Sequence, residues 1–300
     1  MTVVLWIVGM IASEAFEIMS SHEPIAQGST AGIRYSSRLM AALNRFTGNL
    51  AAEAPNPMVH KYGRAYDHLI AADALRYREE LDAALTEYRQ AIDLRQDFVE
   101  AHIGVGKCLR RKGEFQDAVG AFKRALSQNA FNKEVHLDIG KCYNDLGLVK
   151  QAIAHYERAV KLDPTFLEAK FGLALIVELQ GDTTYAMRLY KEIVALDEEF
   201  LPAYNNLGSI HLRLCAYDDA RKVFEELVER SPEFGRGHLG LALTLDRMGS
   251  RREALTAYHR VLTLKPTARN AEFIQRRIVA LNTELGRSKT RNGAMMVRVK

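Results

Sequence analysis

Residues 133–166 read KEVHLDIGKCYNDLGLVKQAIAHYERAVKLDPTF, and this stretch decides the fold. Gly147 supplies the backbone freedom that a tight turn needs after a first helix, and Pro164 stops a second helix. Gly140 and Ala152 lie one on each side of that turn. Their small side chains allow two helices to cross at about 8–10 Å. The stretch therefore predicts a helical hairpin with a close crossing.

The same 34-residue pattern recurs six times between Ala65 and Ala268 without insertion or deletion. Position 20 of each block is alanine, position 8 is small, and position 24 is aromatic. An internal period of this length predicts a repeat architecture. The blocks span residues 65–98, 99–132, 133–166, 167–200, 201–234 and 235–268. We expect the aromatic side chains to fill the space between successive hairpins, and they are Tyr88, Phe122, Tyr156, Tyr190, Phe224 and Tyr258.

This pattern resembles that of the tetratricopeptide-repeat family, which has small residues at positions 8 and 20, aromatic residues at 11 and 24, and proline at 32. The resemblance implies an all-α protein, namely a right-handed superhelical solenoid of six helical hairpins. The first block departs from the pattern, since it has Glu79 where most blocks have a turn glycine and Gln96 at the proline position. Such weakening is typical of a terminal repeat.

The segments that flank the repeats complete the predicted organisation. Residues 269–286 form an amphipathic pattern that predicts a capping helix ending at Gly286. Residues 287–300 carry a charge of +5 and no acidic residue, and we expect them to be a basic, disordered tail. Subtracting that charge from the net +4 leaves the rest of the chain at −1, which argues against a body built to hold nucleic acid.

The N-terminal part of the chain leaves alternatives open. Residues 1–18 begin with an apolar run at 2–12, shorter than the roughly 20 residues that span a bilayer. This run is an atypical export or anchoring segment, or else translation starts at Met19. Residues 19–64 are interpreted as a linker with an amphipathic helix at about 38–54, which docks on the solenoid or binds a membrane surface or partner. We expect a cytoplasmic protein, the alternative being a membrane-associated or exported one.

No constellation of residues predicts catalysis, a cofactor or a metal site. The three cysteines form no C-x-x-C pair and no disulfide framework. Four histidines recur at position 4, but equivalent positions on stacked helices lie ~8–10 Å apart, too far for one metal ion. These histidines, interpreted as packing residues, are His68, His102, His136 and His238. We therefore expect a protein that is not an enzyme and has no small-molecule substrate.

The family resemblance implies that the first helix of each hairpin lines a concave groove through positions 2, 5, 9, 12 and 13. In the first three blocks these positions include five basic residues, opposed by Asp73 and Asp145, and in the last three blocks they include a run of apolar residues. The predicted groove residues are Arg76, Lys107, Arg110, Arg111, Lys141, Phe171, Leu175, Asn205, Asn206 and Leu239. The alternative is that the leucines belong to the core between repeats and the arginines to a solvated surface.

The predicted function is that of a scaffold or adaptor that binds other proteins. The charge pattern favours a peptide or helix with acidic residues towards the first repeats and apolar anchors towards the last. Self-association through the same groove is a further prediction. The alternative functions are a membrane-associated assembly factor, contacting the membrane through the N-terminal segment or the basic tail, and a nucleic-acid-binding protein that uses the tail. Nucleic acid is disfavoured because the aromatic residues stand at packing positions.

Overall fold

A computed structural model describes residues 57–264 and 267–297, and this part of the chain contains helices and no strand. The predictions for residues 1–18 and for the helix at 38–54 lie outside the described residues. The chain divides into two compact units, Met1–His60 and Lys61–Lys300, and the second unit holds the repeats. The helices are α3 Pro57–Tyr77, α4 Leu81–Leu94, α5 Val99–Lys112, α6 Phe115–Gln128, α7 Lys133–Asp145, α8 Val149–Leu162, α9 Leu167–Leu179, α10 Thr183–Leu196, α11 Leu201–Arg213, α12 Tyr217–Arg230, α13 Gly235–Arg247, α14 Arg251–Thr263 and α15 Ala268–Val297.

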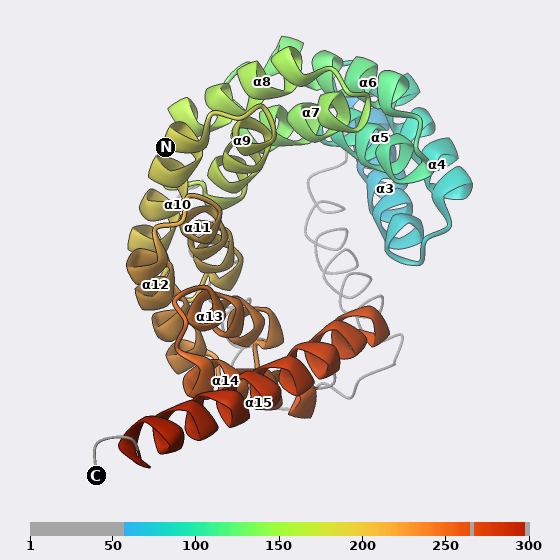
Figure 1. Cartoon of the computed structure of the whole chain (residues 1–300). Coiled ribbons are helices and arrows are strands. Elements are labelled where there is room, and N and C mark those ends of the chain that lie inside the picture. Colours follow the sequence, from blue (N-terminus) through green and yellow to red (C-terminus); the bar gives the residue numbers. More distant parts are fainter. Residues whose placement is uncertain (1–56, 265–266, 298–300) are drawn as a thin grey trace, which may run out of the picture. The chain divides into compact units, whose positions relative to one another are not determined.

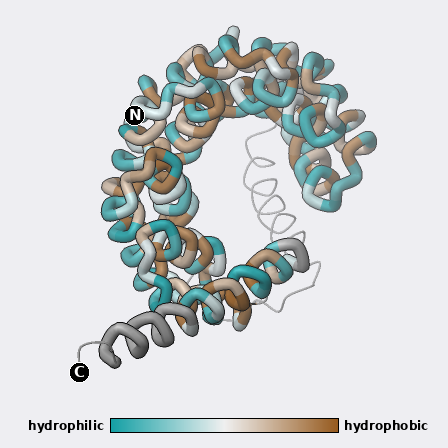
Figure 2. Tube along the Cα trace, in the orientation of Figure 1, coloured by the Kyte–Doolittle hydropathy of each residue, from teal (hydrophilic) through white to brown (hydrophobic). Residues whose placement is uncertain are grey.

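Consecutive helices pack in pairs, so the prediction of an all-α solenoid of six hairpins is confirmed. Within the unit that holds the repeats, the odd-numbered helices from α5 to α13 follow the inner side of the row and the even-numbered ones the outer side (Figure 1). Hydrophobic and hydrophilic residues alternate along these helices, which gives each an apolar side for its neighbours (Figure 2). No helix among the described residues combines the length and apolar character needed to cross a bilayer.

The turn inside each hairpin has one geometry in all six repeats. The residue at position 15 is left-handed each time, with φ between 57° and 88°. The next backbone N–H then bonds a carbonyl five residues back, as from Leu148 to Tyr143 at 2.8 Å, which satisfies groups at the end of the first helix. Four of the six residues are glycine, which adopts this conformation without steric cost. The other two are Glu79 and Cys215.

The position-24 rings form the core between hairpins, as the sequence predicts. The rings of Tyr156 and Phe224 are each wedged between the first helix of their own hairpin and that of the next. A Cβ atom added to Gly140 would lie 2.7 Å from the Tyr156 ring of the same repeat. One added to Gly240 would lie 2.2 Å from the Phe224 ring of the preceding repeat. Glycine at position 6 is therefore a second close contact, and its role was not predicted.

The helix after the last repeat covers the open side of the final hairpin. Ile274, Ile278 and Leu281 of α15 are buried in a cluster with Leu245 and Tyr258. Burying each such aliphatic side chain contributes about 1.5–3 kcal/mol, so the predicted capping role has a clear physical basis.

This capping helix is longer than predicted. α15 continues past Gly286 to Val297, although the sequence predicted a helix end at Gly286 and a disordered tail from residue 287. Residues 287–297 contain no proline, and two arginines, one lysine, one alanine and two methionines among them favour helix. A single glycine inside a helix costs only about 1 kcal/mol, so Gly286 does not have to stop it.

Candidate functional site

The predicted groove residues all lie on the first helices of hairpins, from α3 to α13. We call the surface formed by positions 2, 5, 9, 12 and 13 of these helices the inner face. None of the ten predicted residues is fully buried, since Arg111 and Leu175 are exposed and the other eight are half-buried. Their side chains nevertheless differ in whether they are held by other groups of the protein.

Two of the predicted cations are held by internal contacts. The Nε atom of Arg76 donates to the hydroxyl of Tyr88 at 2.9 Å, and its Nη2 donates to Asp73 at 2.8 Å. Tyr88 in turn donates to Asp73 at 2.6 Å. Burial, together with the bond to Asp73, raises the pKa of Tyr88, so its hydroxyl stays protonated. Arg111 of repeat two forms an ion pair with Glu79 of repeat one. Arg76 is therefore held within its own repeat, whereas Arg111 joins repeats one and two.

Three other predicted cations lie on α5 and α7, and few carboxylates lie close enough to balance their charge. Lys107 and Lys141 occupy position 9 of successive repeats and form no salt bridge with any described residue. Arg110 approaches Asp138 of the next repeat, with 3.9 Å between Nη2 and Oδ1. Its Nε atom is buried and has no hydrogen-bond acceptor among the described residues. We call Lys107, Arg110 and Lys141 the basic cluster.

The apolar part of the inner face contains both packed and exposed side chains. The Phe171 ring lies 5.1 Å from that of Phe200 and 6.0 Å from that of Tyr190, between their centroids. Leu239 packs against the last core cluster. In contrast, Leu175 and Leu179 on α9 are 38% and 80% exposed, and these two leucines are free to contact a ligand.

A polar network separates this apolar part from the last repeats. Asn206 donates to the hydroxyl of Tyr190 at 3.0 Å, and Tyr190 donates to Glu178 at 2.9 Å. Arg213 completes the network with a bond of 2.8 Å to Glu178. Asn205 donates to Asn206 at 3.3 Å. The sequence analysis singled out the two asparagines but missed their partners, which could have been found only from the tyrosine at position 24 and the acid at position 12.

Most of the histidines at position 4 form packing contacts between repeats. The Nε2 atoms of His102 and His238 lie 2.9 Å from the backbone carbonyls of Gln96 and Pro232, which are position 32 of the preceding repeats. His136 makes the equivalent contact with Ala130 at 3.3 Å. His68, in the first repeat, instead contacts Glu87 of its own hairpin, with 2.6 Å between Nδ1 and Oε2. Three of the four histidines therefore join one repeat to the one before it. The described residues contain no group of three or more His, Cys, Asp or Glu side chains that could hold a metal ion.

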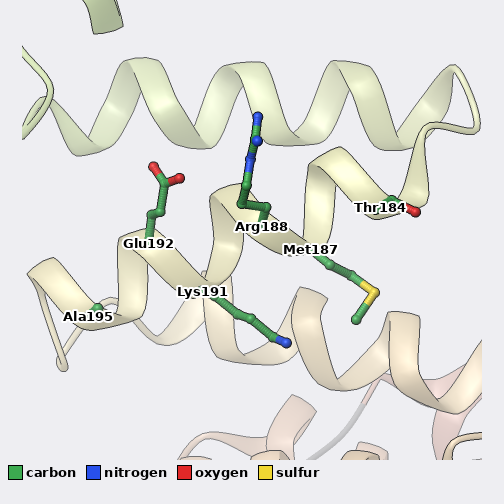
Figure 3. Close-up of a pocket in the computed structure, with 6 residues that line it drawn as sticks. All are labelled: Thr184, Met187, Arg188, Lys191, Glu192 and Ala195. Atoms are coloured by element: carbon green, nitrogen blue, oxygen red, sulfur yellow. The ribbon is translucent and has the colours of Figure 1, made fainter.

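One surface depression lies away from the inner face. It has a volume of about 670 Å³ and is lined by α10 alone. In Figure 3, Arg188 and Glu192 point towards one neighbouring helix, and Met187 and Lys191 point the other way. A depression lined by a single second helix belongs to the outer side of the row. It holds no pairing of a nucleophile with a base among its lining residues, which are Thr184, Met187, Arg188, Lys191, Glu192 and Ala195.

Comparisons with known proteins agree with this architecture. The sequence model of the tetratricopeptide repeat matches residues 71–133, 109–165 and 137–200, and that of the bacterial transcriptional activator domain matches residues 177–265. No curated protein sequence matches the chain.

Several solved structures share the fold. The MamA protein is 28% identical over 56% of this chain and 91% of its own, with a TM-score of 0.52. PilF of Pseudomonas aeruginosa is 14% identical over 73% of this chain and 99% of its own, with a TM-score of 0.61. YrrB is 17% identical over 63% and 97%, with a TM-score of 0.53.

The fold and the inner face together define a helical-repeat solenoid of the kind that serves as a protein-interaction scaffold. This chain belongs to the tetratricopeptide-repeat family.

Proposed function

We propose that this protein is a non-catalytic scaffold or adaptor that binds a peptide or helix of a partner protein on its inner face. Tetratricopeptide-repeat proteins bind other proteins, and the similar structure of YrrB is described as having an unusual peptide-binding site. The observation that carries the proposal is the unpaired charge of Lys107 and Lys141 beside the exposed Leu175 and Leu179.

The order of residues along position 9 supports a ligand that crosses several repeats. The row changes from acidic to basic to apolar or small side chains, and it reads Asp73, Lys107, Lys141, Leu175, Ser209 and Leu243. Charged groups on such a face steer a partner and fix its register, whereas apolar anchors contribute more of the affinity. The remaining predicted groove residues, Arg76, Arg110, Arg111, Phe171, Asn205, Asn206 and Leu239, are proposed to shape this face and to hold its side chains in place.

The test is a comparison of captured partners. The full chain and a Lys107→Glu, Lys141→Glu variant are used as bait in lysate of the source cells, and the bound proteins are identified by mass spectrometry. A Lys150→Glu, Lys161→Glu variant is the matched control, because both lysines are exposed on α8, a second helix. We expect a partner that the full chain and the control retain and the inner-face variant loses. Identical sets from all three baits would refute binding at the basic part of the face.

The apolar part is tested separately by Leu175→Asp with Leu179→Asp. Both side chains are already exposed, so the change leaves the core intact. We expect this variant to lose the same partner. If neither the basic nor the apolar variant changes the captured set, the inner face is not the binding surface and the proposed function fails at this site.

A further inference from the structure

We infer that the basic cluster of Lys107, Arg110 and Lys141 is a carboxylate-binding subsite for an acidic segment of a partner protein. This inference rests on the proposed function and names the chemistry of the ligand at one part of the inner face.

The three cations share one patch that spans two hairpins. Lys107 and Arg110 are three residues apart on α5, and Asp138 and Lys141 are three residues apart on α7. Residues at this spacing are neighbours on the surface of a helix. The 3.9 Å approach of Arg110 to Asp138 joins the two helices at this point, so the three basic side chains converge on the junction between repeats two and three.

The hydrogen bonding of Arg110 is incomplete within the described chain. Its Nε atom is buried without an acceptor, and its closest carboxylate, at Asp138, lies beyond hydrogen-bond distance from Nη2. Buried donors are nearly always paired in folded proteins. An incoming carboxylate supplies two oxygens and four acceptor sites, which suits the partly exposed end of the Arg110 side chain and the lysines on either side of it.

The surrounding acids do not neutralise the cluster. Asp73 is engaged by Arg76 and Tyr88, and Glu79 by Arg111. Asp138 is the only described carboxylate within 4 Å of any basic group in the cluster. Asp145 lies two helical turns beyond it on the inner face and is exposed. Glu100 and Glu134, at position 2 of the same helices, are likewise exposed on the inner face. Within 4 Å, however, the three cations face a single carboxylate, so the patch is locally positive.

The rows of equivalent positions set the spacing of a matching ligand. Lys107, Lys141 and Leu175 are the position-9 residues of repeats two, three and four. Neighbouring helices lie about 8–10 Å apart, which an extended chain covers in about three residues at roughly 3.3–3.6 Å each. The fitting segment therefore has two acidic residues about three apart and an apolar residue about three further on.

The side chains of this part of the face favour an acidic peptide over the phosphates of a nucleic acid. Single-stranded nucleic acid is held by aromatic rings on which its bases stack. The rings on α5 and α7 belong to His102, His136 and Tyr143, and all three are buried. The next repeat instead presents Leu175 and Leu179, which suit an apolar side chain.

The experiment measures direct binding of a defined probe to the full chain. A fluorescein-labelled peptide with the sequence Ser-Glu-Ser-Ser-Glu-Ser-Ser-Leu-Ser is titrated to millimolar protein and followed by anisotropy. A second peptide has glutamine in place of both glutamates, and a labelled thymidine 9-mer represents phosphate. We expect saturable binding of the glutamate peptide, roughly tenfold weaker binding of the glutamine peptide, and no preference for the oligonucleotide.

Substitutions in the protein then test whether the carboxylates of the peptide bind at the basic cluster. We expect a roughly tenfold lower affinity for the glutamate peptide in each of Lys107→Gln, Lys141→Gln and Arg110→Lys. The control changes Lys150→Gln and Lys161→Gln should leave this affinity unchanged. Arg110→Lys keeps the charge but removes the buried Nε donor, so the free protein should melt no lower than the unaltered chain.

Three results would overturn the inference: no saturable binding of the glutamate peptide, equal binding of the glutamine peptide, or tighter binding of the oligonucleotide. If the peptide experiment fails but the Leu175→Asp, Leu179→Asp variant still loses the captured partner, only the carboxylate subsite is refuted. The proposed function then stands. If every inner-face variant still binds both the partner and the glutamate peptide, the carboxylate subsite and the proposed function are both refuted.

Discussion

The Nδ1 atoms of His136 and His155 lie 3.1 Å apart where α7 packs on α8. The Ala130 carbonyl can only accept a hydrogen bond, so the Nε2 atom of His136 must carry a hydrogen and donate to it. In the neutral ring, the Nδ1 atom of His136 is then an acceptor, and the Nδ1–H of His155 is the donor. Protonation of His136 would place two N–H groups against each other at this distance.

We predict that stability falls as the pH drops below the ordinary pKa of histidine. Burial lowers the pKa of His155 to about 4, with His136 and Lys123 adding to the shift, and burial with Arg158 lowers that of His136. The ring of Tyr143 also faces His155. The unfolded chain binds protons at these histidines more readily than the folded one. The stabilisation is therefore fully present above pH 6.5 and is lost as the pH falls from 6.5 to about 4. The loss for His155 is roughly 2 kcal/mol, below the ~3.4 kcal/mol that the full shift in pKa would give, because the ring is partly solvated. Urea unfolding midpoints across this range measure it.

Two variants isolate this effect. His155→Gln can still donate to His136 but does not titrate, so it should flatten the pH dependence of the midpoint. His259→Gln, at an exposed position of α14, should leave it unchanged. An equal slope in all three proteins would show that the pair does not control acid stability.

The sequence predicted the six hairpins because the 34-residue period is uninterrupted and its key positions are defined by side-chain size. Starting residues such as Val99 and Lys133 coincide with the starts of α5 and α7. It did not predict the glycines at position 6, since their role depends on how one hairpin is placed against the ring of the previous one. Contacts between repeats at aligned positions, such as that of Gly240 with Phe224, become visible only in three dimensions.

We predict that Cys215→Gly stabilises the protein by about 0.5–1 kcal/mol. Cys215 has a φ of 57°, and the left-handed region costs a residue with a Cβ atom roughly 1–2 kcal/mol, which is offset in part by the greater freedom of glycine in the unfolded chain. Thermal or urea unfolding measures the gain. The reciprocal change Gly147→Ala, at a φ of 72°, should destabilise. A lower melting temperature for Cys215→Gly would contradict the strain argument.

Substitution of the position-6 glycines tests the fit between hairpins. In Gly104→Ala the new Cβ would lie 2.2 Å from the Tyr88 ring, which is fully buried and cannot move without shifting its neighbours. We expect a loss of about 1–3 kcal/mol in the free energy of unfolding. Gly120→Ala on α6 meets no atom within 4 Å and should instead stabilise, because alanine favours helix by about 1 kcal/mol. If the two variants shift the urea midpoint alike, the ring is not a rigid wedge.

For the candidate site, the sequence could indicate which residues share the inner face but not which of them are engaged. Arg76 at position 12 and Lys107 at position 9 are both basic residues at groove positions in the repeat alignment. The structure distinguishes them, because Arg76 is held by Asp73 and Tyr88 whereas Lys107 has no ion-pair partner among the described residues. Ion pairs between repeats depend on side-chain reach across helices, and no periodic pattern encodes that reach.

The last hairpin depends on an ion pair with the capping helix. Arg277 of α15 donates twice to Asp246 of α13, at 2.6 and 2.7 Å, and the Tyr258 hydroxyl donates to the same carboxylate at 3.1 Å. Burial alone would raise the pKa of Asp246, but the bonds and charge of Arg277 hold it below its ordinary value. Replacing Arg277 therefore leaves a largely enclosed carboxylate without its cation.

We predict that Arg277→Ala loosens α15 before the rest of the solenoid unfolds, since each repeat depends only on its neighbours. The expected cost is about 2 kcal/mol, less than for a fully buried pair because Arg277 is partly solvated. Hydrogen exchange of α13, α14 and α15 measures it, and exchange should accelerate there while α5 to α8 stay protected. Arg276→Ala removes only an exposed pair with Glu272 and should change exchange little. Uniform acceleration along the whole chain would instead indicate that the repeats unfold as a single unit.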